Sequence, residues 1–276
     1  MSPVKEPGFF AFEGDKMQFS GPRDAWMLET VRTTWPRYLE LFEAAQSYHH
    51  VGETSPVYLY DEDAPSRIKT RLPQVKLIAL LRNPVDRALS QFRFMIQCER
   101  EPKSNLMDAL LDEDRRVEAG WEWGWHYRRL GFYGQQMERY YALFDADQIH
   151  VELYDDLIAN AEAVMQRIFH FLDVDISFQP NVQQLHNATR LDTSRRFSRF
   201  LNRTGLRAAA RAVTTRRFRR WAHDRPFMRA ESDVFAAMDA ETRRFLRGHF
   251  RTDIQHLEDL IGRDLDRWLT PDNKRA

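Results

Sequence analysis

The segment KLIALLRNPVDRALSQF, residues 76–92, predicts a strand, a turn and a helix in one short run. Its first part, from Lys76 to Arg82, is apolar without alternation, which is typical of a parallel strand covered on both faces. Pro84 suits the first position of a helix, and helical spacing continues to Gln97. We therefore expect a strand that ends in Arg82 and a helix that follows directly.

The same order occurs again further along the chain. Residues 148–154, QIHVELY, predict a second strand, and Asp155 with Asp156 predict the start of a helix that runs to Leu172. Strands that alternate with helices favour a parallel sheet between layers of helices. The expected fold class is α/β, a three-layer α/β/α arrangement with a central parallel sheet and a helical C-terminal part.

Other segments show apolar residues at helical spacing or end at turn residues. A short strand is expected to end at residues 50–53. The remaining helices are expected at residues 23–45 with a break at Pro36, and at 63–73, 104–118, 130–143, 231–249 and 253–261.

Composition limits the class of protein. With 276 residues, 43% hydrophobic and 13% aromatic, the chain can bury a sizeable core, and we expect residues 1–276 to form one domain. The longest aliphatic run, residues 77–81, is far shorter than the ~20 residues of a membrane-spanning helix. The first residues lack the features of a signal peptide, and the single cysteine, Cys98, fits a reducing compartment. These observations favour a cytoplasmic location, and the formal net charge of zero argues against a nucleic-acid partner.

Arg82 and Ser90 are the first candidate site residues. Ligands of open α/β sheets bind at the carboxyl ends of the strands, where Arg82 would project. Its planar guanidinium can hold a phosphate through two hydrogen bonds, and the Ser90 hydroxyl, eight residues on, can add a third. The same residues also fit a capping arginine and a serine on a helix surface, so their chemistry alone leaves both interpretations open.

The segment resembles the 3′-phosphate-binding motif of sulfotransferases that use 3′-phosphoadenosine 5′-phosphosulfate (PAPS) as donor. In that motif a strand-end arginine and a serine eight residues later bind the 3′-phosphate, and Arg82 and Ser90 match this spacing. The resemblance is to carbohydrate and heparan-sulfate-type enzymes and their bacterial relatives, and it implies a fold like that of P-loop kinases. Further similar segments follow in the family's order: residues 5–10 (KEPGFF), 52–59 (GETSPVYL), 67–68, 131–133, 154–157, 171–174 and 264–268.

The resemblance also implies a reaction and its participants. PAPS would be the donor, adenosine 3′,5′-bisphosphate the product, and no metal would be required. The acceptor would offer a free hydroxyl on a carbohydrate or small molecule, with a glycan or polyanion among the candidates. By position in the family pattern, Glu6 would be the general base, with Lys5 and Glu53 beside the reacting groups, and Tyr133 would lie near the 3′-phosphate.

The segment from 190 to 229 is the strongest charge anomaly, with thirteen arginines and two acidic residues. Sulfotransferases commonly close the donor site with a basic loop late in the chain, and Arg195 and Arg196 lie closest to that position. Binding of a polyanionic acceptor or a membrane surface, and a solvated helix face, are two further interpretations that stay open.

Two departures from the family pattern affect the functional hypothesis. A lysine-containing phosphosulfate loop is expected about twenty to thirty residues before the KEPGFF segment, but only residues 1–4 precede Lys5. A truncated chain, a misassigned start codon or a degenerate enzyme would each explain this. Thr54 stands where many relatives have a lysine. The alternative function is therefore a module that binds a 3′-phosphonucleotide or a polyanion without catalysis, while a P-loop kinase is disfavoured.

Overall fold

The computed structural model describes residues 1–15, 17–24, 30–45, 47–178 and 238–270. Contacts divide the chain into two units, Met1–Pro180 with Met238–Ala276, and Asn181–Ala237. All described residues belong to the first unit. The arginine-rich segment 190–229, with the candidates Arg195 and Arg196, lies outside the described residues. The expectation of one domain over 1–276 therefore stays a prediction.

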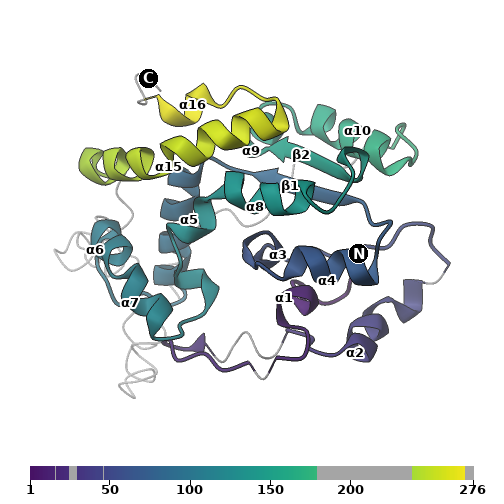
Figure 1. Ribbon diagram of the computed structural model, residues 1–276, viewed down its shortest axis with the longest axis horizontal. Coiled ribbons are helices and arrows are strands. Elements are labelled where there is room, and N and C mark those ends of the chain that lie inside the picture. Colours follow the sequence, from purple (N-terminus) through teal and green to yellow (C-terminus); the bar gives the residue numbers. More distant parts are fainter. Residues whose placement is uncertain (16, 25–29, 46, 179–237, 271–276) are drawn as a thin grey trace, which may run out of the picture. The chain divides into compact units, whose positions relative to one another are not determined.

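The sheet has two strands among the described residues, β1 (Leu77–Leu81) and β2 (Ile149–Leu153). They pair in parallel, with Leu77 opposite Ile149 and Leu81 opposite Leu153. Several helices connect the two strands, as parallel pairing requires (Figure 1). Both strands lie where the sequence predicted them, and the α/β class is confirmed.

The two faces of β1 differ in exposure. Leu81 is buried, whereas Ile78 and Leu80 are 43% and 50% exposed. Because successive side chains of a strand point to opposite faces, Ile78 and Leu80 share one face. The expectation that β1 would be covered on both faces is therefore wrong, since the described helices leave Ile78 and Leu80 open to solvent.

Helices make up most of the described structure. The α-helices are α1 (Phe9–Phe12), α2 (Trp35–Leu39), α3 (Val57–Tyr60), α4 (Ala64–Arg71), α5 (Pro84–Gln97), α6 (Leu106–Leu111), α7 (Glu113–Glu118), α8 (Tyr133–Tyr141), α9 (Tyr154–Ala159), α10 (Ala161–Leu172), α15 (Ala240–Ile261) and α16 (Asp266–Leu269). Short 3-10 turns are η2 (Glu40–Ala45), η3 (Trp123–Trp125), η4 (Arg129–Gly131) and η5 (Ala146–Gln148).

Some helix boundaries follow from the sequence. Pro84 begins α5 as expected, and the Asn83 side chain caps the helix by accepting from the backbone N–H of Val85 at 3.0 Å. The helix predicted to run to Leu172 instead stops and restarts at Asn160, whose side chain accepts from the N–H of Ala163 at 3.0 Å. The segment 104–118 also forms two helices, α6 and α7, rather than one.

The C-terminal part and the loop before α3 correct two predictions. Instead of two helices at 231–249 and 253–261, α15 is continuous because no proline interrupts it, and Gly262, with φ of 62°, ends it. Residues 231–237 lie outside the described structure. The predicted strand end at residues 50–53 is wrong, since these residues form an irregular loop.

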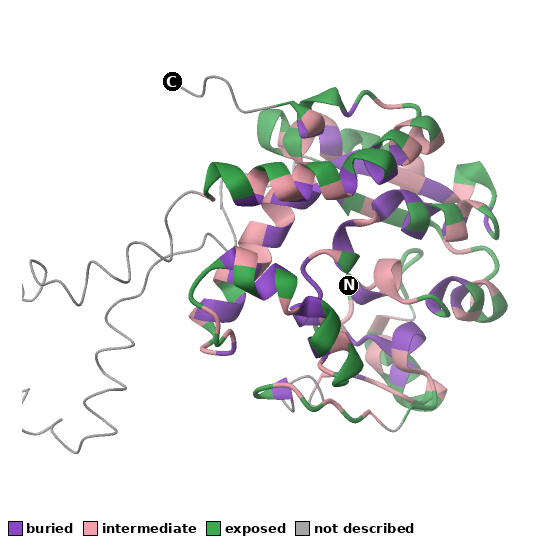
Figure 2. Ribbon diagram, turned by 60° about the vertical axis from the view of Figure 1, so that its left-hand side comes forward, coloured by how far each residue is buried: buried purple, intermediate pink, exposed green. Residues whose placement is uncertain are grey.

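Helix α15 supplies much of the core beside the sheet. Leu246, Phe250, Ile254 and Leu257 are buried at helical spacing and form one apolar stripe. Helix α15 packs mainly on α8 and also on α5. Figure 2 shows buried residues mostly between the elements and exposed residues on the outer sides of the helices. The described helices include none whose length and hydropathy would suit a membrane span.

Candidate functional site

Arg82 follows the last residue of β1. Its guanidinium lies 4.8 Å from the centre of the Tyr154 ring at the start of α9. No carboxylate among the described residues forms an ion pair with Arg82. A half-buried cation at the carboxyl end of a parallel strand is therefore available to an anionic ligand.

Two further arginines, Arg87 and Arg93 of α5, lie near Arg82. Burial lowers the pKa of the Arg87 guanidinium; Tyr133, Glu113 and Tyr127 oppose this shift, and the charge of Arg82 adds to it. Burial and the charge of Arg82 likewise lower the pKa of Arg93. A bound dianion would relieve this repulsion between like charges. Sequence reasoning missed Arg87 and Arg93, although both lie close behind Arg82 in the chain.

Ser90 lies half-buried on α5, between Asp86 and Arg93. Residues three or four apart share one face of a helix, so Ser90 shares its face with Arg93. Asp86, on the same face, pairs at 3.2 Å with Arg243 of α15. The predicted pair of Arg82 and Ser90 thus occupies the strand end and the first turns of the following helix, with added positive charge beside it.

Tyr133 joins this group from the start of α8. Its side chain is buried, and burial raises the pKa of its hydroxyl. The charges of Arg87 and Arg82 and the adjacent backbone amide of Arg82 oppose that rise. The structure therefore brings Tyr133 and Arg82 together. We call Arg82, Arg87, Ser90, Arg93 and Tyr133 the strand-end cluster.

A second group of candidates lies in the loop before α3. The Ser55 hydroxyl donates to Glu53 Oε2 at 2.8 Å and accepts from the backbone N–H of Gly8 at 3.0 Å. Burial raises the pKa of the Glu53 carboxyl, while the hydrogen bond from Ser55 and the nearby hydroxyl groups of Tyr58 and Tyr38 oppose the shift. Sequence reasoning missed Tyr38 and Tyr58, although Tyr58 lies inside the segment that carried the resemblance.

The charge of Glu6 raises the pKa of Glu53 further, which indicates that the two carboxylates lie near each other. The Glu6 backbone has φ of 54°, an uncommon conformation for a residue other than glycine, and Gly8 follows with φ of 63°. Lys5 is exposed, and its Nζ lies 3.6 Å from Glu6 Oε1. The structure thus groups Glu6, Lys5 and Glu53, which we call the two-carboxylate cluster. Thr54 is exposed on the same loop.

Arg67 fixes the position of α1 after Glu6. Its guanidinium donates to the backbone carbonyls of Phe10 at 3.1 Å and Ala11 at 2.9 Å, and it pairs with Asp63 at 3.1 Å. These contacts satisfy the C-terminal end of α1. Arg67 therefore acts on the helix that follows Glu6, and its described polar contacts do not include Glu53.

Helix α8 contacts elements of both clusters. Tyr133, its first residue, belongs to the strand-end cluster. Near its other end, the Arg139 guanidinium donates to the carbonyls of Leu59 and Tyr60, and the Tyr140 hydroxyl donates to the carbonyl of Tyr58 at 2.7 Å. One short helix thus supports Tyr133 and also holds α3, which follows the Glu53 loop.

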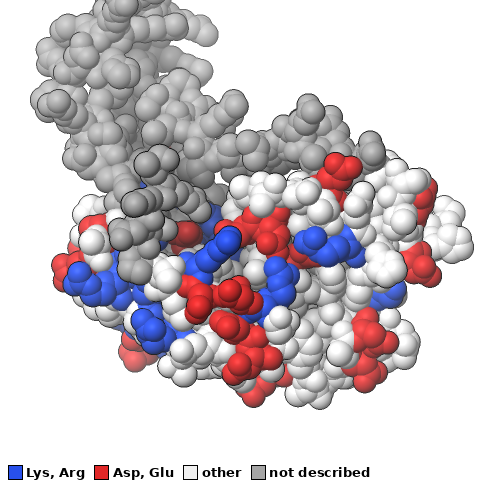
Figure 3. Space-filling view, turned by 90° about the horizontal axis from the view of Figure 1, so that it is seen from above, with Lys and Arg blue, Asp and Glu red and all other residues white. Residues whose placement is uncertain are grey.

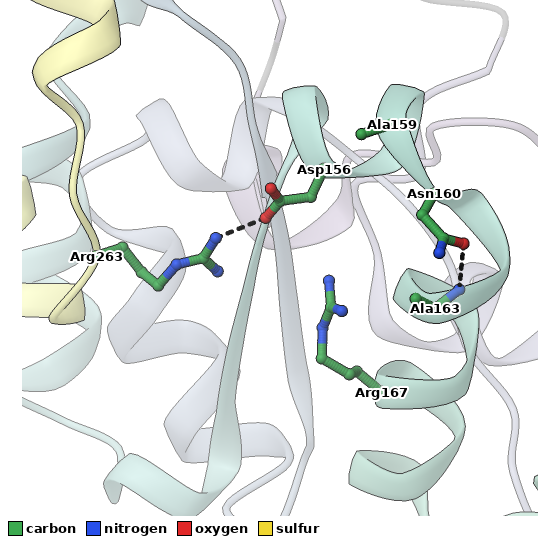
Figure 4. A pocket seen from close by; sticks show the side chains of 6 residues that line it. All are labelled: Asp156, Ala159, Asn160, Ala163, Arg167 and Arg263. Carbon is green, nitrogen blue, oxygen red and sulfur yellow. Dashed lines mark hydrogen bonds and ion pairs between the residues drawn. The ribbon is translucent and has the colours of Figure 1, made fainter.

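A surface pocket of about 410 Å³ lies elsewhere, between α9, α10 and the turn after α15 (Figure 4). Arg263 pairs with Asp156 at 2.6 Å, and Arg167 forms two hydrogen bonds to Glu152, at 2.8 and 2.7 Å. Both arginines therefore already have carboxylate partners. On the face shown in Figure 3, basic and acidic side chains are interspersed among the described residues, without one large basic patch.

The chain is similar to a known protein family and to solved structures. A family profile described as "Sulfotransferase domain" matches residues 25–237. The solved structure of a sulfotransferase from Alicyclobacillus acidocaldarius is similar with a TM-score of 0.74 and 27% identity, and the match covers 98% of this chain and 87% of that one.

Two curated proteins are similar over shorter regions. Heparan sulfate glucosamine 3-O-sulfotransferase 5 of Homo sapiens is 29% identical over 156 residues, which is 55% of this chain and 43% of the relative. Membrane-associated sulfotransferase kil1 of Dictyostelium discoideum is 36% identical over 85 residues, which is 31% of this chain and 18% of the relative. Each match thus covers less than half the length of the curated relative.

Proposed function

The chain belongs to the sulfotransferase domain family, and from this premise we propose that it transfers a sulfuryl group from PAPS to an acceptor hydroxyl. The observation that carries the proposal is Arg82, a cation at the end of a parallel strand without a carboxylate partner among the described residues. A 3′-phosphate would supply the missing negative charge. Residues 1–276 would act as one sulfotransferase domain.

The strand-end cluster suits the 3′-phosphate of the donor. Arg82 would form two hydrogen bonds to the phosphate oxygens, and the Ser90 hydroxyl would add a third. Arg93 and Arg87 would contribute positive charge, which the effect of the Arg82 charge on each of them supports. Tyr133 would contact the same end of the nucleotide. Arg195 and Arg196 remain candidates for the other side of the donor.

The two-carboxylate cluster suits the acceptor. In the reaction the acceptor oxygen forms a bond to sulfur, and the bond from sulfur to the bridging phosphate oxygen breaks. Glu6 would accept the hydroxyl proton, and Lys5 beside it would stabilise charge on the sulfuryl oxygens. Glu53, held by Ser55, would orient the acceptor. The left-handed backbone at Glu6 supports a functional role, because such conformations are often retained at active sites.

The acceptor is a glycan hydroxyl in this proposal. The support is the similarity to a protein named as a heparan sulfate glucosamine 3-O-sulfotransferase. Two tyrosines, the buried Tyr38 and the half-buried Tyr58, also place hydroxyl groups and aromatic rings beside Glu53, a combination that suits sugars.

Nucleotide binding tests the donor assignment. The affinities of the wild type and of Arg82→Ala for adenosine 3′,5′-bisphosphate and for adenosine 5′-monophosphate are measured by isothermal titration calorimetry. Arg82→Ala should lose ~10²-fold or more of its affinity for the bisphosphate, because each hydrogen bond to a charged group contributes ~1.5–3 kcal/mol, and should bind the monophosphate almost unchanged. Arg115→Ala, which removes an exposed arginine paired with Asp112, is the control. An unchanged affinity of Arg82→Ala for the bisphosphate would refute the donor site.

Transfer of radioactive sulfate from PAPS to a panel of glycans tests the reaction. Glu6→Gln should lower turnover by ~10²–10⁴-fold while the affinity for the donor stays the same, which is the pattern of a lost general base. Unaffected turnover would remove Glu6 from the mechanism. Tight bisphosphate binding without any transfer by the wild type would favour the non-catalytic alternative.

A further inference from the structure

Asp253 of α15 caps the start of another helix, α8. Its carboxylate accepts from the backbone N–H groups of Gly134 at 2.9 Å and Gln135 at 3.0 Å, and its side chain is only 6% exposed. The first N–H groups of a helix have no partner inside the helix. Phe132, at the capping position of α8, supplies no side-chain hydrogen bond, so Asp253 takes over that role from 119 residues away.

The packing around this cap leaves no space for adjustment. A Cβ atom at Gly134 would lie 2.6 Å from the carbonyl oxygen of Asp253. A Cβ atom at Gly131 would lie 2.6 Å from the Phe250 ring and 3.0 Å from the side chain of Pro84. Helix α15 therefore presses the start of α8 against the first residue of α5, the helix that follows Arg82.

The residue held in this way is Tyr133, the first residue of α8. The close packing of Gly131 on Pro84 sets Tyr133 near the end of β1, where the backbone amide of Arg82 opposes the rise in the pKa of its hydroxyl. A shift of α8 would move Tyr133 away from Arg82, although Asp253 itself belongs to neither cluster.

We propose that Asp253 is a positioning residue of the donor site, which fixes Tyr133 against Arg82 by capping α8 from α15. This inference rests on the proposed function. It predicts that Asp253 affects recognition of the 3′-phosphate and leaves recognition of the rest of the nucleotide unchanged.

The test compares Asp253→Asn with Asp259→Asn, the same substitution at an exposed position of the same helix. An asparagine keeps one acceptor oxygen, but its NH₂ group faces the other backbone N–H, so one of the two capping hydrogen bonds is lost. Calorimetry gives the ratio of affinities for adenosine 3′,5′-bisphosphate and adenosine 5′-monophosphate, and circular dichroism confirms that each variant is folded. The ratio should fall about tenfold in Asp253→Asn, the effect of one weakened hydrogen bond to a charged group, and stay unchanged in Asp259→Asn.

Tyr133→Phe gives a second measurement. This variant should also lower the affinity ratio. The double variant Asp253→Asn with Tyr133→Phe should lower the ratio little more than the more severe single variant does, because both substitutions act on one contact. If Asp253→Asn does not fold, Gln135→Pro replaces it. This change removes one N–H donor to Asp253 at an exposed position in the first turn, where proline is tolerated.

The outcomes separate the two proposals. Equal affinities of the wild type for the two nucleotides would overturn the proposed function, and this inference with it. A wild-type preference for the bisphosphate that persists in folded Asp253→Asn or Gln135→Pro would overturn this inference alone. Equal losses for both nucleotides would show that Asp253 only stabilises the fold.

Discussion

Ser55 connects the loop that carries Glu53 to the segment that carries Glu6. Its hydroxyl both accepts from the buried N–H of Gly8 and donates to the Glu53 carboxylate. A single side chain therefore holds the left-handed turn after Glu6 and favours the charged form of Glu53, as a hydrogen bond to a carboxylate does.

Ser55→Ala should lower the free energy of unfolding by about 1–3 kcal/mol, because it leaves the N–H of Gly8 buried without an acceptor. It should also raise the pKa of Glu53 further. Urea denaturation measures the first effect. Ser66→Ala, which removes an exposed hydroxyl bonded to the Asp63 carbonyl, is the control and should change stability little. Equal effects of the two substitutions would argue against the role of Ser55.

His126 should make stability depend on pH. Burial and the charge of Arg129 lower its pKa to about 4, and the Tyr60 hydroxyl lies 2.9 Å from its Nδ1. In the unfolded chain the pKa is near 6.5, so between these values the unfolded state binds a proton that the folded state excludes. This contribution reduces stability as pH falls from 7 to 5, by about 2 kcal/mol.

The measurement is urea denaturation of His126→Gln at pH 7 and pH 5. Relative to the wild type, this variant should lose about 2 kcal/mol less on acidification, while His170→Gln, at an exposed position, should behave like the wild type. An identical pH dependence of both variants would mean that His126 is accessible to protons in the folded state.

At the scale of elements, a buried ion network joins the end of α5 to the segment before η3. Arg100 pairs with Asp24 at 2.5 Å and with Glu122 at 2.6 Å, and all three side chains are almost fully buried. The Trp125 indole also donates to Asp24 at 3.0 Å. The aromatic stretch around Trp125 thus packs on this network.

Arg100→Met should lower the free energy of unfolding by about 3–5 kcal/mol, because it leaves two carboxylates buried without a cation. Arg115→Met breaks an exposed pair with Asp112 and should have a much smaller effect. Thermal or urea denaturation compares the two variants. A small loss in Arg100→Met would indicate that Asp24 and Glu122 become protonated or hydrated at little cost.

Helices and strands that depend on residues close together in the chain could be predicted from the sequence. The strand and helix of residues 76–97 depend on an apolar run, a proline and a capping asparagine that are neighbours in the chain. The continuous α15 was predicted as two helices, 231–249 and 253–261, whereas Asp253 lies inside α15 and caps α8. That role depends on a contact over 119 residues, which no local pattern contains.

The residues of the candidate site likewise divide into those that local motifs predict and those that only the fold brings together. Arg82, Ser90 and Glu6 could be predicted from the sequence because the motifs around them are contiguous. Tyr38, which lies beside Glu53, became visible only when distant segments were placed together, because no local pattern links it to the Glu53 loop. The predicted residues therefore define the candidate site, and the packing of α8 and α15 explains how its parts are held.

At the scale of the whole molecule, the apolar face of β1 should promote self-association. Ile78 and Leu80 are exposed side by side on one face of a parallel strand, an arrangement that favours contact with another apolar surface. Threonine has a high propensity for strands and is polar, so Ile78→Thr with Leu80→Thr should keep the strand while making this face compatible with water.

The double variant should therefore form fewer oligomers at high concentration and change the free energy of unfolding by less than about 1 kcal/mol. Size-exclusion chromatography with light scattering measures the first quantity, and urea denaturation the second. Leu81→Thr, on the buried face of the same strand, is the matched control and should cost about 2–4 kcal/mol. If the double variant were as unstable as Leu81→Thr, the face of Ile78 and Leu80 would have to be covered in solution, because removing exposed apolar groups cannot produce such a loss.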